Sequence, residues 1–206
     1  MRPARRARYA GRVKPRALLV LLAVACDPAP ESAADEPVVP ALPLCEPVAE
    51  FATLAVEDAL LAQINALRRD GGTCGALRFL PAPPLAITPE LRCIARLHSK
   101  DMAVRGFLAQ VDPDGLGTDN RLDAVGVAAS TFAENVGFVD DADLTDAEDE
   151  AADAIVRSWQ DNPTTCWKLY ARELTDLGVG AVRGSYDPKD TEAVVGVYWT
   201  ATFTAP

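Results

Sequence analysis

Apolar residues change their spacing along this chain, from a helical repeat in residues 56–106 to strict alternation in residues 194–204. A helix or strand buries one face, so this spacing indicates which element a segment forms. The apolar residues of the first helical segment share one side: Val56, Leu60, Leu61, Ile64 and Leu67. One face of the last segment collects a second set: Val195, Val197, Trp199, Ala201 and Phe203. Helices first and strands last predict an α+β layered domain.

Start and stop signals place the other predicted elements. Arg68 and Arg69 before Gly71 end the first helix, and Thr88 followed by Pro89 begins a second one that runs to about Gly106. Its predicted buried side contains four residues: Leu91, Ala95, His98 and Met102. The remaining predictions are strands over 132–139 and 177–182, a turn over 186–190, a helix starting at a capping box over 145–148, and a short helix after Asn162–Pro163.

The N-terminal segment has the composition of an export signal. Residues 1–16 contain seven Lys or Arg, and the apolar run 17–25 is too short to span a bilayer permanently. We therefore predict a signal peptide over residues 1–25. The small residues before Cys26 resemble a lipobox, which predicts acylation of the Cys26 thiol. The alternative is ordinary cleavage after Ala25 and free secretion, and either route takes the chain out of the cytoplasm.

Residues 26–53 have the composition of a tether. They are rich in proline, alanine and acidic residues and show no apolar periodicity. A lipid on Cys26 would hold the protein to a membrane while the tether lets the domain stand away from it. The sequence thus predicts a signal peptide (1–25), a lipid-anchored tether (26–53) and one folded domain (54–205). The expected location is the extracytoplasmic side of a cell-envelope membrane.

Charge and cysteine content limit the partners and the compartment. The net charge of the chain is −10, and removal of the basic residues 1–25 makes the remainder more acidic. An acidic surface without a basic stripe repels phosphates, so a nucleic-acid partner is not expected. Cys45, Cys74, Cys93 and Cys166 form an even set, which predicts two disulfides in an oxidising compartment. Spacing alone leaves three pairings open.

Seven short motifs follow one another along the predicted domain: Ile64–Arg68, Ala95–Met102, Phe107 before Asp114–Gly115, Glu134–Gly137, Trp159 with Asn162–Pro163, Gly178–Gly180, and Tyr198–Trp199. Together and in this order they resemble the bacterial CAP (SCP/PR-1-like) domain family. The resemblance covers residues 54–205 and implies an α-β-α sandwich with about four helices around a small antiparallel sheet. It also implies a Cys74–Cys166 disulfide, which leaves Cys45 to pair with Cys93.

The metal-binding kind of CAP domain places two histidines and two glutamates around a central cavity. The resemblance assigns one of these positions to Glu134, whereas Gln110, Asn162 and Thr165 stand at the other three. Neutral amide and hydroxyl oxygens replace imidazole and carboxylate poorly as Zn²⁺ ligands, so we expect neither a metal nor another cofactor. These four residues are the candidate cavity residues.

His98, the single histidine, lies on the predicted buried side of the second helix, where we expect a hydrogen-bonded core residue and not a ligand. Two acidic segments, 140–153 and 112–115, lack the oxygen spacing of a Ca²⁺ loop. We interpret the first as a solvated helix start and the second as a turn.

The resemblance does not specify a ligand, and a fold is a poor guide to activity. The leading hypothesis is a non-catalytic binding or interaction module for a lipid, a glycan or a protein. One alternative is a metal-independent hydrolase in which Glu134 acts through water. Another is an inert structural protein of the cell envelope.

Overall fold

The computed structural model describes residues 54–141, 148–187 and 192–206. The predicted signal peptide and tether therefore lie outside the described residues, as do Cys26, Cys45 and most of the capping box at 145–148. The described helices are α1 (Leu54–Asp70), α2 (Pro89–Arg105), α3 (Thr118–Ala124), α4 (Glu148–Asp161) and α5 (Pro163–Tyr170). The strands are β1 (Gly72–Cys74), β2 (Leu77–Phe79), β3 (Ala86–Ile87), β4 (Thr131–Asp140), β5 (Asp176–Tyr186) and β6 (Val194–Ala205). None of these helices is both long and apolar enough to cross a membrane.

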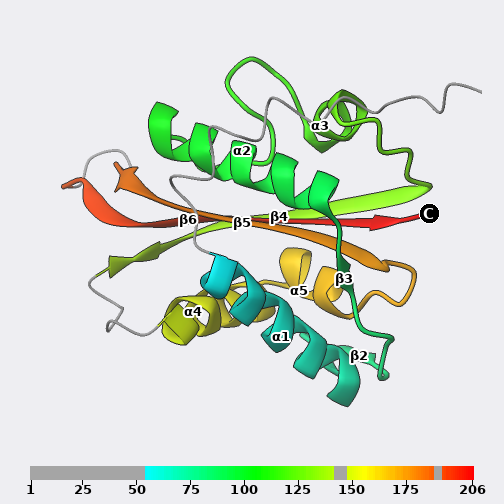
Figure 1. Cartoon of the computed structure of the whole chain (residues 1–206). Helices are drawn as coiled ribbons and strands as arrows, with labels where there is room; N and C mark the ends of the chain where they lie inside the picture. The colour runs from blue at the N-terminus through cyan, green and yellow to red at the C-terminus, as the bar shows by residue number, and fades with distance from the viewer. Residues whose placement is uncertain (1–53, 142–147, 188–191) are drawn as a thin grey trace, which may run out of the picture. The chain divides into compact units, whose positions relative to one another are not determined.

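The folded part is an α-β-α sandwich, as predicted. Its main sheet has the order β3-β5-β6-β4, and β1 and β2 form a separate hairpin. Helices α2 and α3 lie on one face of the sheet, whereas α1, α4 and α5 lie on the other (Figure 1). Three features differ from the prediction: the β1–β2 hairpin and the short helix α3 are additional, and so is the two-residue strand β3, which runs parallel to β5.

Helices on both faces bury both sides of β6. One side, with Trp199, Ala201 and Phe203, belongs to the larger apolar core together with residues of α1, α4 and α5. The opposite side presents Tyr198, Thr200 and Thr202, which are also fully buried. The hydroxyl groups of Thr200 and Thr202 are therefore buried between the sheet and the helices α2 and α3.

Two glycines let α2 lie directly on β5. A Cβ atom at Gly178 would lie 2.0 Å from the carbonyl carbon of Leu91, and one at Gly180 would lie 2.4 Å from that of Ala95. Any side chain there would push the helix off the sheet, so glycine is required for this packing. The Ser99 hydroxyl uses the close approach to donate to the Gly180 carbonyl at 2.9 Å.

The boundaries of α2 follow from its capping residues. The Thr88 hydroxyl accepts a hydrogen bond from the Leu91 N–H, Pro89 is the first helical residue, and Gly106 ends the helix with a φ of 67°. The predicted buried residues Leu91, Ala95, His98 and Met102 are all buried. The start, the end and the inward side of α2 are therefore confirmed.

Arg68 differs from the expectation that it simply marks a polar helix end. Its side chain is fully buried and donates to the carbonyls of Pro83, Leu169, Ala171 and Leu174. A buried guanidinium needs such partners because it has left water. Arg68 thus ties the end of α1 to the chain that leaves α5.

The disulfide between Cys74 and Cys166 is present and joins β1 to α5 across a sequence separation of 92 residues. Cys93 is also disulfide-bonded. The Cys45–Cys93 pairing stays a prediction, because Cys45 lies outside the described residues.

Candidate functional site

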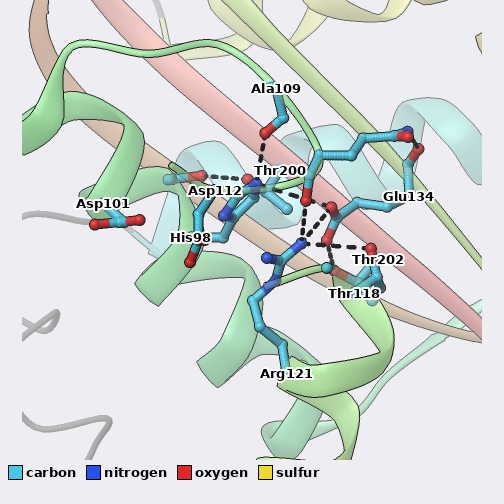
Figure 2. A network of polar contacts seen from close by, with 12 residues as sticks. His98, Asp101, Ala109, Asp112, Thr118, Arg121, Glu134, Thr200 and Thr202 are labelled. Atoms are coloured by element: carbon cyan, nitrogen blue, oxygen red, sulfur yellow. Dashed lines mark hydrogen bonds and ion pairs between the residues drawn. The ribbon is translucent and has the colours of Figure 1, made fainter. Parts of the chain in front are cut away.

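Glu134 lies at the centre of a polar network between the sheet and the α2–α3 layer (Figure 2). It is 3% exposed and pairs in register with Thr202 of β6. The Thr202 hydroxyl donates to Oε2 of Glu134 at 3.1 Å. Arg121 of α3 donates from Nη2 to Oε1 at 2.7 Å. Both carboxylate oxygens therefore have partners within the protein.

Helix α3 and the loop before it position Arg121. The N–H of Gly117 donates to the Asn120 side chain at 2.9 Å, which fixes the start of α3. One turn into the helix, Arg121 also donates to the carbonyls of Gln110 at 2.8 Å and Leu116 at 3.3 Å. A single guanidinium thus connects the loop, the short helix and the carboxylate.

His98 of α2 approaches the same carboxylate, but its bond is to another group. Its Nε2 lies 2.9 Å from the carbonyl oxygen of Ala109 and 3.8 Å from Oε1 of Glu134. Because a carbonyl only accepts, the hydrogen is on Nε2 and points at Ala109. The distance to Glu134 is too long for a hydrogen bond.

Burial shifts both ionisable groups towards their neutral forms. It lowers the pKa of His98 to about 4, and the positive charge of Arg121 acts in the same direction, while the bond to Ala109 opposes it. Burial also raises the pKa of Glu134, although the charge of Arg121 and the hydroxyls of Thr118 and Thr202 oppose the rise. His98 is therefore uncharged at neutral pH.

The main-chain carbonyl of Glu134 has partners of its own. The Gln110 amide donates to it, and the Lys168 ammonium of α5 lies 2.7 Å from it. Burial lowers the pKa of Lys168, and the negative charge of Glu134 partly offsets that effect. Glu134 is thus held at its backbone as well as at its carboxylate.

The family model for the cysteine-rich secretory protein (CAP) family matches residues 61–203. The chain belongs to the CAP family. The resemblance that the seven motifs indicated is therefore confirmed. No curated protein matches this CAP chain in sequence.

Solved structures with similar folds come from several organisms. An outer surface protein of Borrelia burgdorferi has 13% identity and a TM-score of 0.56, and the match covers 74% of this chain and 94% of that one. An extracellular SCP-domain protein of Bacillus anthracis has 20% identity and a TM-score of 0.49, with 73% of this chain matching 41% of that chain. A venom allergen-like protein of Schistosoma mansoni has 10% identity, a TM-score of 0.43 and coverages of 73% and 86%. At such identities the Borrelia likeness shows the fold alone.

The structure brings together two of the four candidate cavity residues of this CAP domain, Gln110 and Glu134. Asn162 is exposed, and its side chain caps α5 by accepting from the Thr164 N–H at 3.0 Å. The Thr165 hydroxyl donates to the Trp159 carbonyl at 2.8 Å. Asn162 and Thr165 therefore serve the junction between α4 and α5.

The network is completed by Thr118, Arg121, Lys168 and Thr202. No pattern in the sequence indicated the role of Arg121. Alternation along 194–204 indicated only that Thr202 shares a face with Thr200. In the described ranges of the chain, no three His, Cys, Asp or Glu side chains are grouped to hold a metal ion. The guanidinium of Arg121 contacts the carboxylate of Glu134, whereas the ammonium of Lys168 contacts its main-chain carbonyl.

The depressed pKa of His98 makes the stability of this domain depend on pH. The unfolded chain takes up a proton near pH 6.5, whereas the folded chain does so only near pH 4. The contribution of neutral His98 is therefore complete above pH 6.5 and is lost as the pH falls to 4. A His98→Gln variant keeps a donor for Ala109 and has no titrating ring. From pH 7 to pH 4, wild type is expected to lose about 3 kcal/mol of unfolding free energy relative to this variant.

Urea unfolding of both proteins across this pH range measures the difference. Parallel stability curves would show that His98 titrates normally in the folded protein.

Proposed function

We propose that this chain is an exported CAP-domain lipoprotein that acts as a non-catalytic binding module with a degenerate metal site. The observation that supports the proposal most strongly is the 2.7 Å contact between Arg121 and Oε1 of Glu134. A carboxylate that is neutralised by a guanidinium has lost the free charge that a metal ion or an activated water requires. The ligand class, whether lipid, glycan or protein, is a separate matter.

Three features of the network argue against Zn²⁺ at this place. Arg121 repels a second cation, Gln110 offers only an amide, and the Nε2 of His98 is protonated and bonded to Ala109. A stable Zn²⁺ site needs three or four thiolate, imidazole or carboxylate donors. The residues present do not fit such an ion.

A metal-independent hydrolase is the second candidate, and one observation favours it. His98 and Glu134 lie 3.8 Å apart, and burial shifts the pKa of each, which is a frequent property of acid–base pairs. However, the Nε2 hydrogen of His98 is directed at Ala109, and Arg121 holds the Oε1 that faces His98. A binding role therefore agrees better with these contacts.

Calorimetry with Zn²⁺ on chelator-stripped protein tests the degenerate metal site. No stoichiometric binding in the micromolar range is expected, and a Glu134→Ala variant should give the same heats as wild type. Micromolar binding that disappears in Glu134→Ala would contradict the proposal. Ester hydrolysis that is lost in Glu134→Gln would contradict it independently and would favour the hydrolase.

The proposed membrane anchor rests on the sequence around Cys26. Small residues precede this cysteine, and an acid- and proline-rich segment follows it. Acyl chains gain about 0.8 kcal/mol per buried methylene, so several chains on one cysteine retain a protein at a membrane. The predicted location on the extracytoplasmic side follows from the same signal.

Replacement of Cys26 by Ala should move the protein from the detergent phase to the aqueous phase in a detergent-partitioning experiment. Cys45→Ala is the matched control, since it also removes one cysteine near the N-terminus and should leave the partitioning unchanged. Continued partitioning of Cys26→Ala into detergent would exclude the anchor.

A further inference from the structure

A second surface of the CAP domain is formed by the β1–β2 hairpin, the end of α1 and the region around the end of α5. We call it the β2 face and define it by Leu77–Pro81 together with Arg69, Trp167 and Arg172. Leu77, Leu80 and Trp167 are exposed by 63%, 67% and 37%. Clustered exposed apolar side chains of this size mark interaction surfaces more often than isolated ones do.

Strand β2 has one occupied edge. It pairs with β1 through Cys74 and Leu77, which flank a two-residue turn, and through Thr73 and Arg78. Hydrogen-bonded and non-hydrogen-bonded pairs alternate in an antiparallel ladder, and the pair next to a two-residue turn is bonded. The main-chain N–H and C=O of Arg78 therefore point to the outer edge. Within the described ranges they have no hydrogen-bond partner outside the hairpin.

Two hollows adjoin β2, and Arg78, Phe79 and Leu80 line each of them. One hollow, of about 330 Å³, is completed by residues 70–73 and Pro81. The other, of about 290 Å³, is completed by Trp167, Tyr170 and the residues that follow α5. Hollows beside a free strand edge suit the side chains of an extended peptide that adds to that edge.

The charge of the β2 face is opposite to that of the whole chain. Arg78 and Arg172 line the two hollows, and Arg69 lines an adjoining one with Pro81 and Arg172. The only acids in these linings are Asp70 and Glu173, whereas the chain carries a net charge of −10. Asp70 is already paired with Arg69 at 2.8 Å. Arg78 forms no ion pair with any described residue, and the guanidinium of Arg172 donates to the Pro81 carbonyl. The face therefore complements a negatively charged partner.

We propose that the β2 face binds an extended acidic peptide, which adds as a strand to the outer edge of β2. The main chain of the peptide pairs with Arg78, its carboxylates contact the guanidinium group of Arg78, which lines both hollows, and its apolar side chains enter the hollow beside Trp167. This inference rests on the proposed binding role and gives it a surface and a partner class. Strand addition supplies affinity through main-chain bonds and specificity through side-chain pockets. An anionic bilayer would use the same charges but not the strand edge.

The probe is a synthetic heptapeptide, Glu-Val-Glu-Val-Glu-Val-Glu, titrated into the full chain. Trp167 reports binding by a change in its fluorescence. Trp159 and Trp199 are only 2% and 0% exposed, so a peptide bound at the surface changes their fluorescence little. We expect saturable binding that falls at least tenfold in Arg78→Glu. The matched control is Arg157→Glu, which makes the same charge change at an exposed position of α4, away from β2 (Figure 1), and should bind as wild type does.

Two further peptides separate the parts of the proposal. A Lys-Val heptapeptide tests the charge, and a Glu-Val heptapeptide with N-methylated main-chain amides tests the strand pairing. Both should bind at least tenfold more weakly than the probe. Equal binding of either peptide, or equal binding of the probe to Arg78→Glu, would overturn the proposal. Arg78-dependent binding to phosphatidylglycerol vesicles without binding of the probe would overturn it in favour of a membrane surface.

The outcome is independent of the test of the non-catalytic role. If the protein neither binds the peptide nor hydrolyses esters, the β2 face is excluded as the binding surface, and the proposed non-catalytic binding role still stands. If the protein hydrolyses esters and Glu134→Gln does not, the non-catalytic role is excluded whether or not the peptide binds.

Discussion

The buried carboxylate of Glu134 is the constraint around which the layer of α2 and α3 in this CAP domain is arranged. Taking a carboxylate out of water costs several kcal/mol unless charge and hydrogen bonds replace its hydration. Arg121 supplies the charge and Thr202 supplies a hydroxyl from the neighbouring strand. Because Arg121 also holds the carbonyls of the preceding loop, the requirement of one side chain fixes the loop and helix α3.

The two faces of the sheet have different physical roles. On the face covered by α1, α4 and α5, these helices pack against the sheet through apolar side chains. The Cys74–Cys166 disulfide and the carbonyl bonds of Arg68 tie the parts of this layer to one another. On the face covered by α2 and α3, Gly178 and Gly180 let α2 approach β5 so closely that the Ser99 hydroxyl donates directly to the Gly180 carbonyl. A stable apolar layer therefore supports a second layer that is held by a polar network.

Local signals predicted the fold well, whereas the site depended on contacts that no local signal reports. Thr88, Pro89 and Gly106 define a helix by their own backbone preferences, and the alternation in residues 194–204 defines a strand. Arg121 lies in a seven-residue helix that is too short to show an apolar repeat, and its partner is 13 residues away. Arg68 lies four residues after Ile64, on the apolar side of α1, but its charge favoured a solvated helix end, and the four carbonyls that accept from it come from distant segments.

A double-mutant cycle on the unfolding free energy tests most directly whether Arg121 is the structural partner of Glu134. Loss of one partner of a buried pair leaves an uncompensated charge, so Arg121→Gln alone should cost about 3–5 kcal/mol. The variant with both Arg121→Gln and Glu134→Gln has no such charge and should be more stable than Arg121→Gln alone. A large favourable coupling energy is the predicted result. Additive effects of the two substitutions would show that Arg121 does not neutralise Glu134.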